Sequence, residues 1–192
     1  LEKRGLVQRL PNHRPVIRVS KPSGAQNQTK TPDQIAIWIL PDFQDLGGMM
    51  ILQGIRSVFG RGGYRLLIAC PPSSDQSVIE KAEVEFLRGL VGNPDVAGAI
   101  VWDTGNPGCV AAYRDLVAAN VPLVFVDREP PFEIDADVVA CNNRGAARKA
   151  VQHLLDLGHR RISMVVASER ASSVRDRIEG YRLALEQAEI SL

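Results

Sequence analysis

From residue 35 onward, short apolar segments alternate with longer amphipathic ones, and this alternation constrains the fold more than any other feature of the chain. Helical spacing of apolar residues appears between most of the short segments. Strands that are buried on both faces and alternate with helices are typical of a parallel sheet with right-handed crossovers. The sequence therefore predicts an α/β fold whose strands lie at 35–40, 64–70, 96–102, 123–126, 138–141 and 162–167.

The segment 121–128 (Val-Pro-Leu-Val-Phe-Val-Asp-Arg) is the clearest of these strands, because an apolar run ends abruptly in two charged residues. Small ligands bind open α/β sheets outside the carboxyl ends of the strands. Asp127 is therefore a candidate ligand contact, whose carboxylate would accept hydrogen bonds from ligand hydroxyls. The alternative is a carboxylate that caps a helix or joins two strands.

Charge is distributed unevenly along the 192 residues. Residues 1–34 carry seven Lys or Arg against two acidic side chains, whereas the remainder carries 16 basic and 20 acidic ones. A basic head on a mildly acidic body suggests a polyanionic partner, although a solvated basic tail has the same composition. Residues 21–34 are rich in Pro, Gly, Ser, Thr, Asn and Gln, which predicts a flexible linker.

Motifs of other protein classes are missing from the sequence. Cys70, Cys109 and Cys141 are widely spaced, which predicts small core residues and neither a disulfide framework nor a zinc site. P-loop, GxGxxG and GxSxG motifs are absent, so we expect no enzyme, no cofactor and no bound metal. Without a membrane-length apolar run or a signal peptide, we expect a cytoplasmic protein with no membrane partner.

The first twenty residues resemble the end of a GntR-type winged helix-turn-helix domain. A helix end at Gly5 precedes two strand candidates at 6–10 and 16–19, joined by a Pro-rich turn. That turn contains His13 and Arg14 where the family usually has glycines. An arbitrary hairpin with surface arginines is the alternative. The resemblance implies DNA contacts, mainly to phosphates or the minor groove, by Lys3, Arg9, His13 and Arg14.

Three phrases farther along resemble the effector-binding domain of the LacI/GalR regulators, which share the type I fold of periplasmic sugar-binding proteins. They are Val-Pro at 121–122 with Val-Asp-Arg at 126–128, the segment 142–162 that opens with Asn-Asn-Arg-Gly, and 177–185. Their order and spacing carry the resemblance, which covers residues 35–192. A GntR-type head on a LacI-type body is similar to the arabinose-repressor arrangement.

This resemblance implies an effector site between two lobes. Arg177 would reach into the cleft and fork onto ligand oxygens, as planar guanidinium groups do, unless it is an ordinary surface arginine. Asn142 stands where the family commonly has Asp, which suggests a changed ligand. Phe43 and Trp102 would stack on the ligand, or belong to the core. The candidate effector-binding residues are therefore Asp127, Arg177, Asn142, Phe43 and Trp102.

The expected organisation is the end of a winged helix at 1–20, a linker at 21–34, an N-terminal lobe at 35–160 and the start of a truncated C-terminal lobe at 161–192. Such a fragment is expected to bind ligand poorly and to expose apolar surface on segment 162–167 and the last helix. The expected function is a ligand-responsive, DNA-binding transcriptional repressor. It would act as a homodimer on operator DNA and bind a sugar or similar small polar effector. The alternative is a solute-binding protein of a transport system with the same fold.

Overall fold

The structure is a computed structural model that describes residues 7–8, 16–17, 31–39, 46–71, 74–130, 132–166 and 171–191. Near the N-terminus, strand β1 (Val7–Gln8) pairs antiparallel with strand β2 (Val16–Ile17). The pairing agrees with the two strands expected at 6–10 and 16–19. The helix end at Gly5 and the turn between the strands lie outside the described residues.

A five-stranded parallel sheet forms the body of the protein, which confirms the predicted α/β fold. Its strand order is β4-β3-β5-β6-β7, and every neighbouring pair is parallel. The strands are β3 (Gln34–Trp38), β4 (Arg65–Ala69), β5 (Val96–Val101), β6 (Leu123–Val126) and β7 (Asp137–Val139). The helices are α1 (Leu46–Phe59), α2 (Gln76–Leu90), α3 (Val110–Ala118), α4 (Asn143–Asp156) and α5 (Ser172–Gln187), with a short 3₁₀ turn at Pro107–Cys109.

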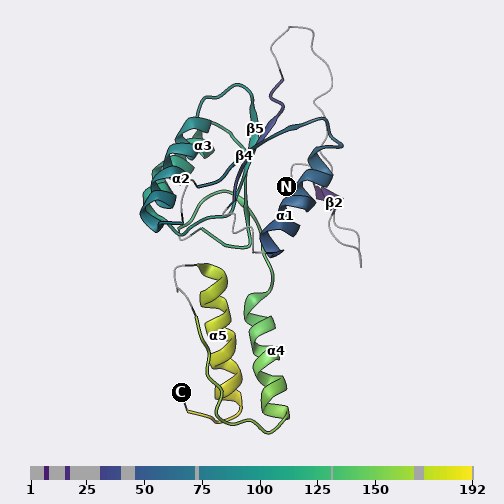
Figure 1. Cartoon of the computed structure of the whole chain (residues 1–192), viewed down its shortest axis with the longest axis vertical. Helices are drawn as coiled ribbons and strands as arrows, with labels where there is room; N and C mark the ends of the chain where they lie inside the picture. The colour runs from purple at the N-terminus through teal and green to yellow at the C-terminus, as the bar shows by residue number, and fades with distance from the viewer. Residues whose placement is uncertain are drawn as a thin grey trace.

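Helices cover both faces of the sheet and bury two separate groups of apolar side chains (Figure 1). Alternate residues of a strand point to opposite faces. Accordingly, Ala36 and Trp38 pack with α2 and α3, whereas Ile35 and Ile37 pack on the other face with the apolar residues of α1. This three-layer arrangement leaves the carboxyl ends of the strands uncovered by the helices that pack on the faces.

Helix α2 begins after an N-cap at Asp75, whose carboxylate accepts hydrogen bonds from the Ser77 and Val78 N–H groups. The cysteines differ from the sequence prediction. Only Cys109 is a core cysteine; Cys70 and Cys141 are exposed, so that prediction was wrong for two of the three. Both exposed cysteines follow the two edge strands, β4 and β7, which lack a neighbouring strand on one side.

Helices α4 and α5 pack against each other and form a unit that extends away from the sheet (Figure 1). Their shared core contains Val151, Leu155, Ala184 and Leu185. The contact is close at Gly180, where an added Cβ would lie 2.2 Å from the Arg144 carbonyl oxygen. Helix α4, which belongs to the predicted N-terminal lobe, thus packs with α5 of the predicted C-terminal lobe.

The strand predicted at 162–167 does not form over its described residues, 162–166. The Tyr181 hydroxyl donates to the Ile162 carbonyl at 2.8 Å, which holds this segment beside α5. Val165 is 96% exposed, in agreement with the expected apolar exposure. A β-branched run becomes a strand only beside another strand, and none of the described strands pairs with this segment.

Candidate functional site

Asp127 follows the carboxyl end of β6 in a conformation that few side chains adopt. Its φ is 66°, in the left-handed region, where Asp and Asn are the best tolerated after Gly. The Asp127 N–H donates to the Val139 carbonyl at 2.9 Å, so contact with β7 stabilises this turn. The carboxylate lies 3.7 Å from Arg128 Nε with 23% of the side chain exposed. The turn therefore presents the carboxylate at the edge of the sheet.

The Arg128 guanidinium is held between β5 and β6. It donates through Nη1 to the Asp103 carbonyl at 3.1 Å and lies 5.6 Å from the centre of the Trp102 ring, within cation–π distance. Burial lowers the pKa of Arg128 despite the neighbouring carboxylate of Asp127. Its Nε is buried and has no hydrogen-bond partner among the described residues. Part of the hydrogen-bonding capacity of this cation is therefore unused.

Near Arg128 lie two fully buried carboxyl groups that the sequence did not reveal. Glu83 of α2 is 0% exposed and Asp103, after β5, is 1% exposed. The Tyr113 hydroxyl lies 3.4 Å from Glu83 Oε1 and 3.2 Å from Asp103 Oδ1, but its single hydrogen can serve only one of them at a time. Burial raises the pKa of Glu83 to about 7 and also raises that of Asp103. One carboxyl group of the pair therefore holds a proton near neutral pH.

Thr104 and Gly105 tie this carboxyl pair to the loop after β5. The Thr104 N–H donates to Glu83 Oε1 at 3.3 Å, and its hydroxyl contacts Glu83 Oε2. The Gly105 N–H donates to Asp103 Oδ2 at 2.8 Å. A sequence signal for this cluster did exist: Glu83 lies four residues from both Ile79 and Leu87, on the apolar stripe of its helix.

Arg177 of α5 is hydrogen-bonded to the first residue of α4, next to the segment that follows β7. Its Nε donates to the Asn143 side-chain oxygen at 2.9 Å, and Asn143, which is 5% exposed, donates to the Cys141 carbonyl at 3.2 Å. A second connection joins the β6 end to α5, because the Glu129 N–H donates to the Ser172 hydroxyl oxygen at 2.7 Å. Asn143 was also missed, although it stands inside the Asn-Asn-Arg-Gly phrase.

The charges of Asp127 and Arg177 both act on the pKa of Arg128. Burial lowers this pKa most, the charges of Asp127, Asp103 and Glu83 raise it, and the charge of Arg177 lowers it. Asp127 and Arg177 remain candidates for one effector site at the carboxyl edge of the sheet.

The other predicted site residues have different surroundings. The Asn142 side-chain oxygen caps α4 by accepting from the Gly145 N–H at 2.8 Å, so this acceptor is already used. Trp102 is 7% exposed and lies beneath Arg128, within the apolar group that packs against α1. Phe43 and the predicted DNA contacts Lys3, Arg9, His13 and Arg14 lie outside the described residues.

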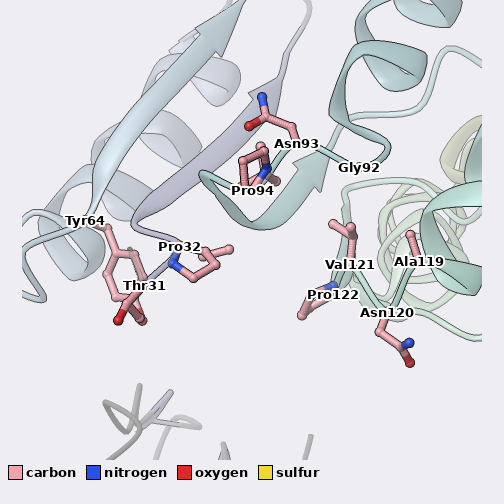
Figure 2. Close-up of a pocket in the computed structure, with 12 residues that line it drawn as sticks. Thr31, Pro32, Tyr64, Gly92, Asn93, Pro94, Ala119, Asn120, Val121 and Pro122 are labelled. Carbon is pink, nitrogen blue, oxygen red and sulfur yellow. The ribbon is translucent and has the colours of Figure 1, made fainter. Parts of the chain in front are cut away.

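A hollow of about 550 Å³ lies elsewhere, at the amino ends of the strands. Figure 2 shows Thr31 and Pro32, which precede β3, on one side of it and Val121 and Pro122, which precede β6, on the other. None of its lining residues is charged. It is therefore a poor candidate for the predicted site, whose residues lie at the opposite edge of the sheet.

The part of the chain that the structure describes shows neither a metal-binding cluster nor a membrane-spanning helix. No group of three or more His, Cys, Asp or Glu side chains there is placed to hold a metal ion. No helix of that part is both long and apolar enough to cross a membrane.

Several known proteins resemble the chain, although no protein-family model matches it. The ribose operon repressor of Escherichia coli K12 is 35% identical over 143 residues, which are 74% of this chain and 41% of that protein. The HTH-type transcriptional regulator MalR of Streptomyces coelicolor is 29% identical over 143 residues, 74% of this chain and 40% of that protein. The chain thus spans about two fifths of the length of these relatives.

A solved structure of the lac repressor dimer, bound to operator and the anti-inducer ONPF, superposes with a TM-score of 0.65. It is 20% identical and covers 84% of this chain and 54% of that one. The chain shares the fold of this repressor structure. The relatives and the fold agree with the resemblance to LacI/GalR-type effector-binding domains. A LacI-type helix-turn-helix head agrees with these relatives better than the GntR-type winged helix, whose resemblance rested on about twenty residues.

Proposed function

We propose that the intact protein is a ligand-responsive transcriptional regulator, a repressor, that binds a sugar or similar small polar effector at the carboxyl edge of the sheet. The observation that carries this proposal is the contact of α5, the helix of Arg177, with the segment after β6, where the Glu129 N–H donates to the Ser172 hydroxyl oxygen at 2.7 Å, two residues beyond Asp127. Asp127 would accept hydrogen bonds from effector hydroxyls, and the Arg177 fork would donate to effector oxygens. Asn142, Phe43 and Trp102 remain candidates for further contacts.

Effector binding would act through the connection between the sheet unit and the α4–α5 unit. The Glu129 N–H donates to the Ser172 hydroxyl oxygen, so a hydrogen bond joins the segment after β6 to α5, close in the chain to Asp127. A ligand that touches both units favours one relative placement, and such coupling is typically worth about 1–3 kcal/mol. The change would be passed to the DNA-binding heads, whose spacing must match the half-sites of the operator.

The basic residues 1–34 would contribute to operator binding, with Lys3, Arg9, His13 and Arg14 contacting phosphates or the minor groove. The protein would then act in the cytoplasm, where bacterial operator DNA lies. Support comes from the regulator and repressor names of the relatives. Whether the head is a LacI-type helix-turn-helix or a GntR-type winged helix would be decided by the structure of the intact chain on DNA.

The intact protein would be a homodimer. Edge strand β4 and helix α1 would form the surface through which the two copies associate. Leu67 and Ile68 on β4 are 40% and 42% exposed, and Met49 and Met50 on α1 are 45% and 62% exposed. Exposed apolar residues that gather on neighbouring elements mark association surfaces. The dimeric state of the lac repressor in the operator complex supports this choice of occupant.

Operator titrations with the intact protein at several salt concentrations test the regulator. The logarithm of the binding constant should fall linearly with the logarithm of salt, with a slope of roughly −0.9 per phosphate contact. A flat salt response would exclude the regulator and favour the alternative, a solute-binding protein of a transport system with the same fold.

A thermal-shift screen against sugars, sugar acids and nucleobases would identify the effector class. Asp127→Asn should then weaken effector binding by about tenfold or more, equivalent to about 1.4 kcal/mol, and leave operator affinity without effector unchanged. Arg182→Gln is the matched control, because Arg182 is an exposed arginine of α5. Equal effector affinity in Asp127→Asn and wild type would reject the proposed site.

A further inference from the structure

The loop after β5 joins two buried carboxyl groups, here called the carboxyl pair, to one guanidinium. Glu83 of α2 and Asp103 are 0% and 1% exposed, and the Tyr113 hydroxyl lies 3.4 Å from Glu83 Oε1 and 3.2 Å from Asp103 Oδ1. Asp103 also holds Arg128, because its carbonyl accepts from Arg128 Nη1 at 3.1 Å. The same residue therefore connects the carboxyl pair to the side chain that lies beside Asp127.

The carboxyl pair has too few partners for two negative charges. Neither Glu83 nor Asp103 forms an ion pair with a residue that the structure describes. A carboxylate that is buried without a cation is strongly disfavoured and takes up a proton instead. A proton on Glu83 also ends the competition for the Tyr113 hydroxyl, which can then donate to Asp103. Burial raises the pKa of Glu83 to about 7, in agreement with one proton on the pair near neutral pH.

Other ionisable groups surround the carboxyl pair. Those whose charges act on the pair or on its neighbours are Glu80, Cys109, Tyr113, Asp127, Arg128 and Arg177. Burial raises the pKa values of Cys109 and Tyr113, so both keep their protons near neutral pH. Among the described residues, Arg128 is the cation that is hydrogen-bonded to a member of the pair.

Loss of the proton leaves two buried negative charges, and Arg128 is placed to compensate them. Its guanidinium contacts the Asp103 carbonyl through Nη1, and its Nε lies 3.7 Å from the Asp127 carboxylate. This Nε is buried and has no hydrogen-bond partner among the described residues, so a carboxylate inside the protein could accept from it without breaking an existing hydrogen bond. Buried ion pairs need such hydrogen bonds to offset the desolvation of their charges.

We propose that the proton on the carboxyl pair positions Arg128. With the proton present, the guanidinium stays beside Asp127; when the proton leaves, the guanidinium moves toward the Asp103 carboxylate and away from Asp127. Glu83 and Asp103 are thus positioning residues for the carboxyl edge of the sheet. The consequence for ligand binding rests on the proposed function: Asp127 loses its neighbouring cation, so the effector meets a different charge at this edge on either side of neutral pH.

An NMR titration of the intact protein between about pH 5.5 and 8.5, without effector or operator, tests this positioning. The Arg128 Nε–H and Trp102 indole N–H resonances report the guanidinium, whose central carbon lies 5.6 Å from the centre of the Trp102 ring. Both resonances are expected to move with one midpoint near pH 7, shared with the carboxyl carbon of Glu83. Glu83→Gln should remove this transition, and the matched control Glu85→Gln, at an exposed position of the same helix, should keep it.

Tyr113→Phe keeps the test decisive if Glu83→Gln does not fold, because it leaves the ring that packs against Phe125, 5.1 Å between centres. The Tyr113 hydroxyl favours the ionised carboxylate by donating to it, so its removal should move the midpoint upward by about one pH unit. The inference is overturned if the Arg128 and Trp102 resonances do not move together in wild type, if their transition persists in Glu83→Gln, or if Tyr113→Phe leaves the midpoint unchanged. Operator titrations of the same protein decide the regulator proposal separately, so the two can fail independently.

Discussion

Replacement of Glu83 by Gln should change how the stability of the protein depends on pH. In the folded protein, burial raises the pKa of Glu83 from 4.5 to about 7. At about 1.36 kcal/mol per pKa unit, this corresponds to roughly 3 kcal/mol of unfolding free energy. The folded protein binds the Glu83 proton more tightly than the unfolded chain does. The stabilisation is therefore complete below pH 4.5 and is lost as the pH rises through about 7.

Glu83→Gln removes this titration and keeps an oxygen that can accept from the Thr104 N–H. Between pH 4.5 and 8, the unfolding free energy of the variant should therefore increase relative to wild type by about 3 kcal/mol. Urea unfolding followed by tyrosine and tryptophan fluorescence across this pH range measures the difference. Glu85→Gln is the matched control, since Glu85 is exposed on the same helix and faces Lys81 at 3.9 Å. Parallel pH profiles for Glu83→Gln and wild type would refute the reasoning.

Two further predictions concern packing and assembly. Gly180→Ala should destabilise the α4–α5 pair by about 1–3 kcal/mol, because its Cβ would overlap the Arg144 carbonyl. The control is Gly89→Ala in α2, where an added Cβ has nothing within 4 Å and should stabilise the protein by up to about 1 kcal/mol. Thermal unfolding of both variants measures the two effects. An unchanged stability of Gly180→Ala would contradict the observed helix contact. Leu67→Glu on edge strand β4 should weaken the dimer at least tenfold in sedimentation experiments, and an unchanged dimer would move the interface to another surface.

The sheet unit could be predicted from sequence because its strands carry local signals. Strand β6 occupies the residues expected for it, 123–126, where an apolar run ends in charge. The segment 162–167 carries the same β-branched signal, yet its described part forms no strand. Strand formation depends on a neighbouring strand, which a local pattern does not reveal.

The candidate site could be predicted only in part, because some of its contacts join segments that are distant in the sequence. Asp127 was found because parallel strands place their carboxyl ends at one edge, and Arg177 because its surroundings resemble those of a known family. Glu83, Asp103 and Asn143 depend instead on which helix packs beside which loop. A glutamate on a helix is usually solvated, so only its place on the apolar stripe marked Glu83 as unusual.

The left-handed backbone at Asp127 restricts how this protein can change its ligand preference. Most side chains are strained at a φ of 66°, whereas Asp, Asn and Gly tolerate it. At this position, therefore, only replacement of Asp by Asn or Gly avoids backbone strain. Such a replacement would change the ligand contact from a carboxylate to an amide, or remove it. Larger changes in selectivity have to come from residues in ordinary backbone conformations around it, with Arg128 the nearest of them in the chain.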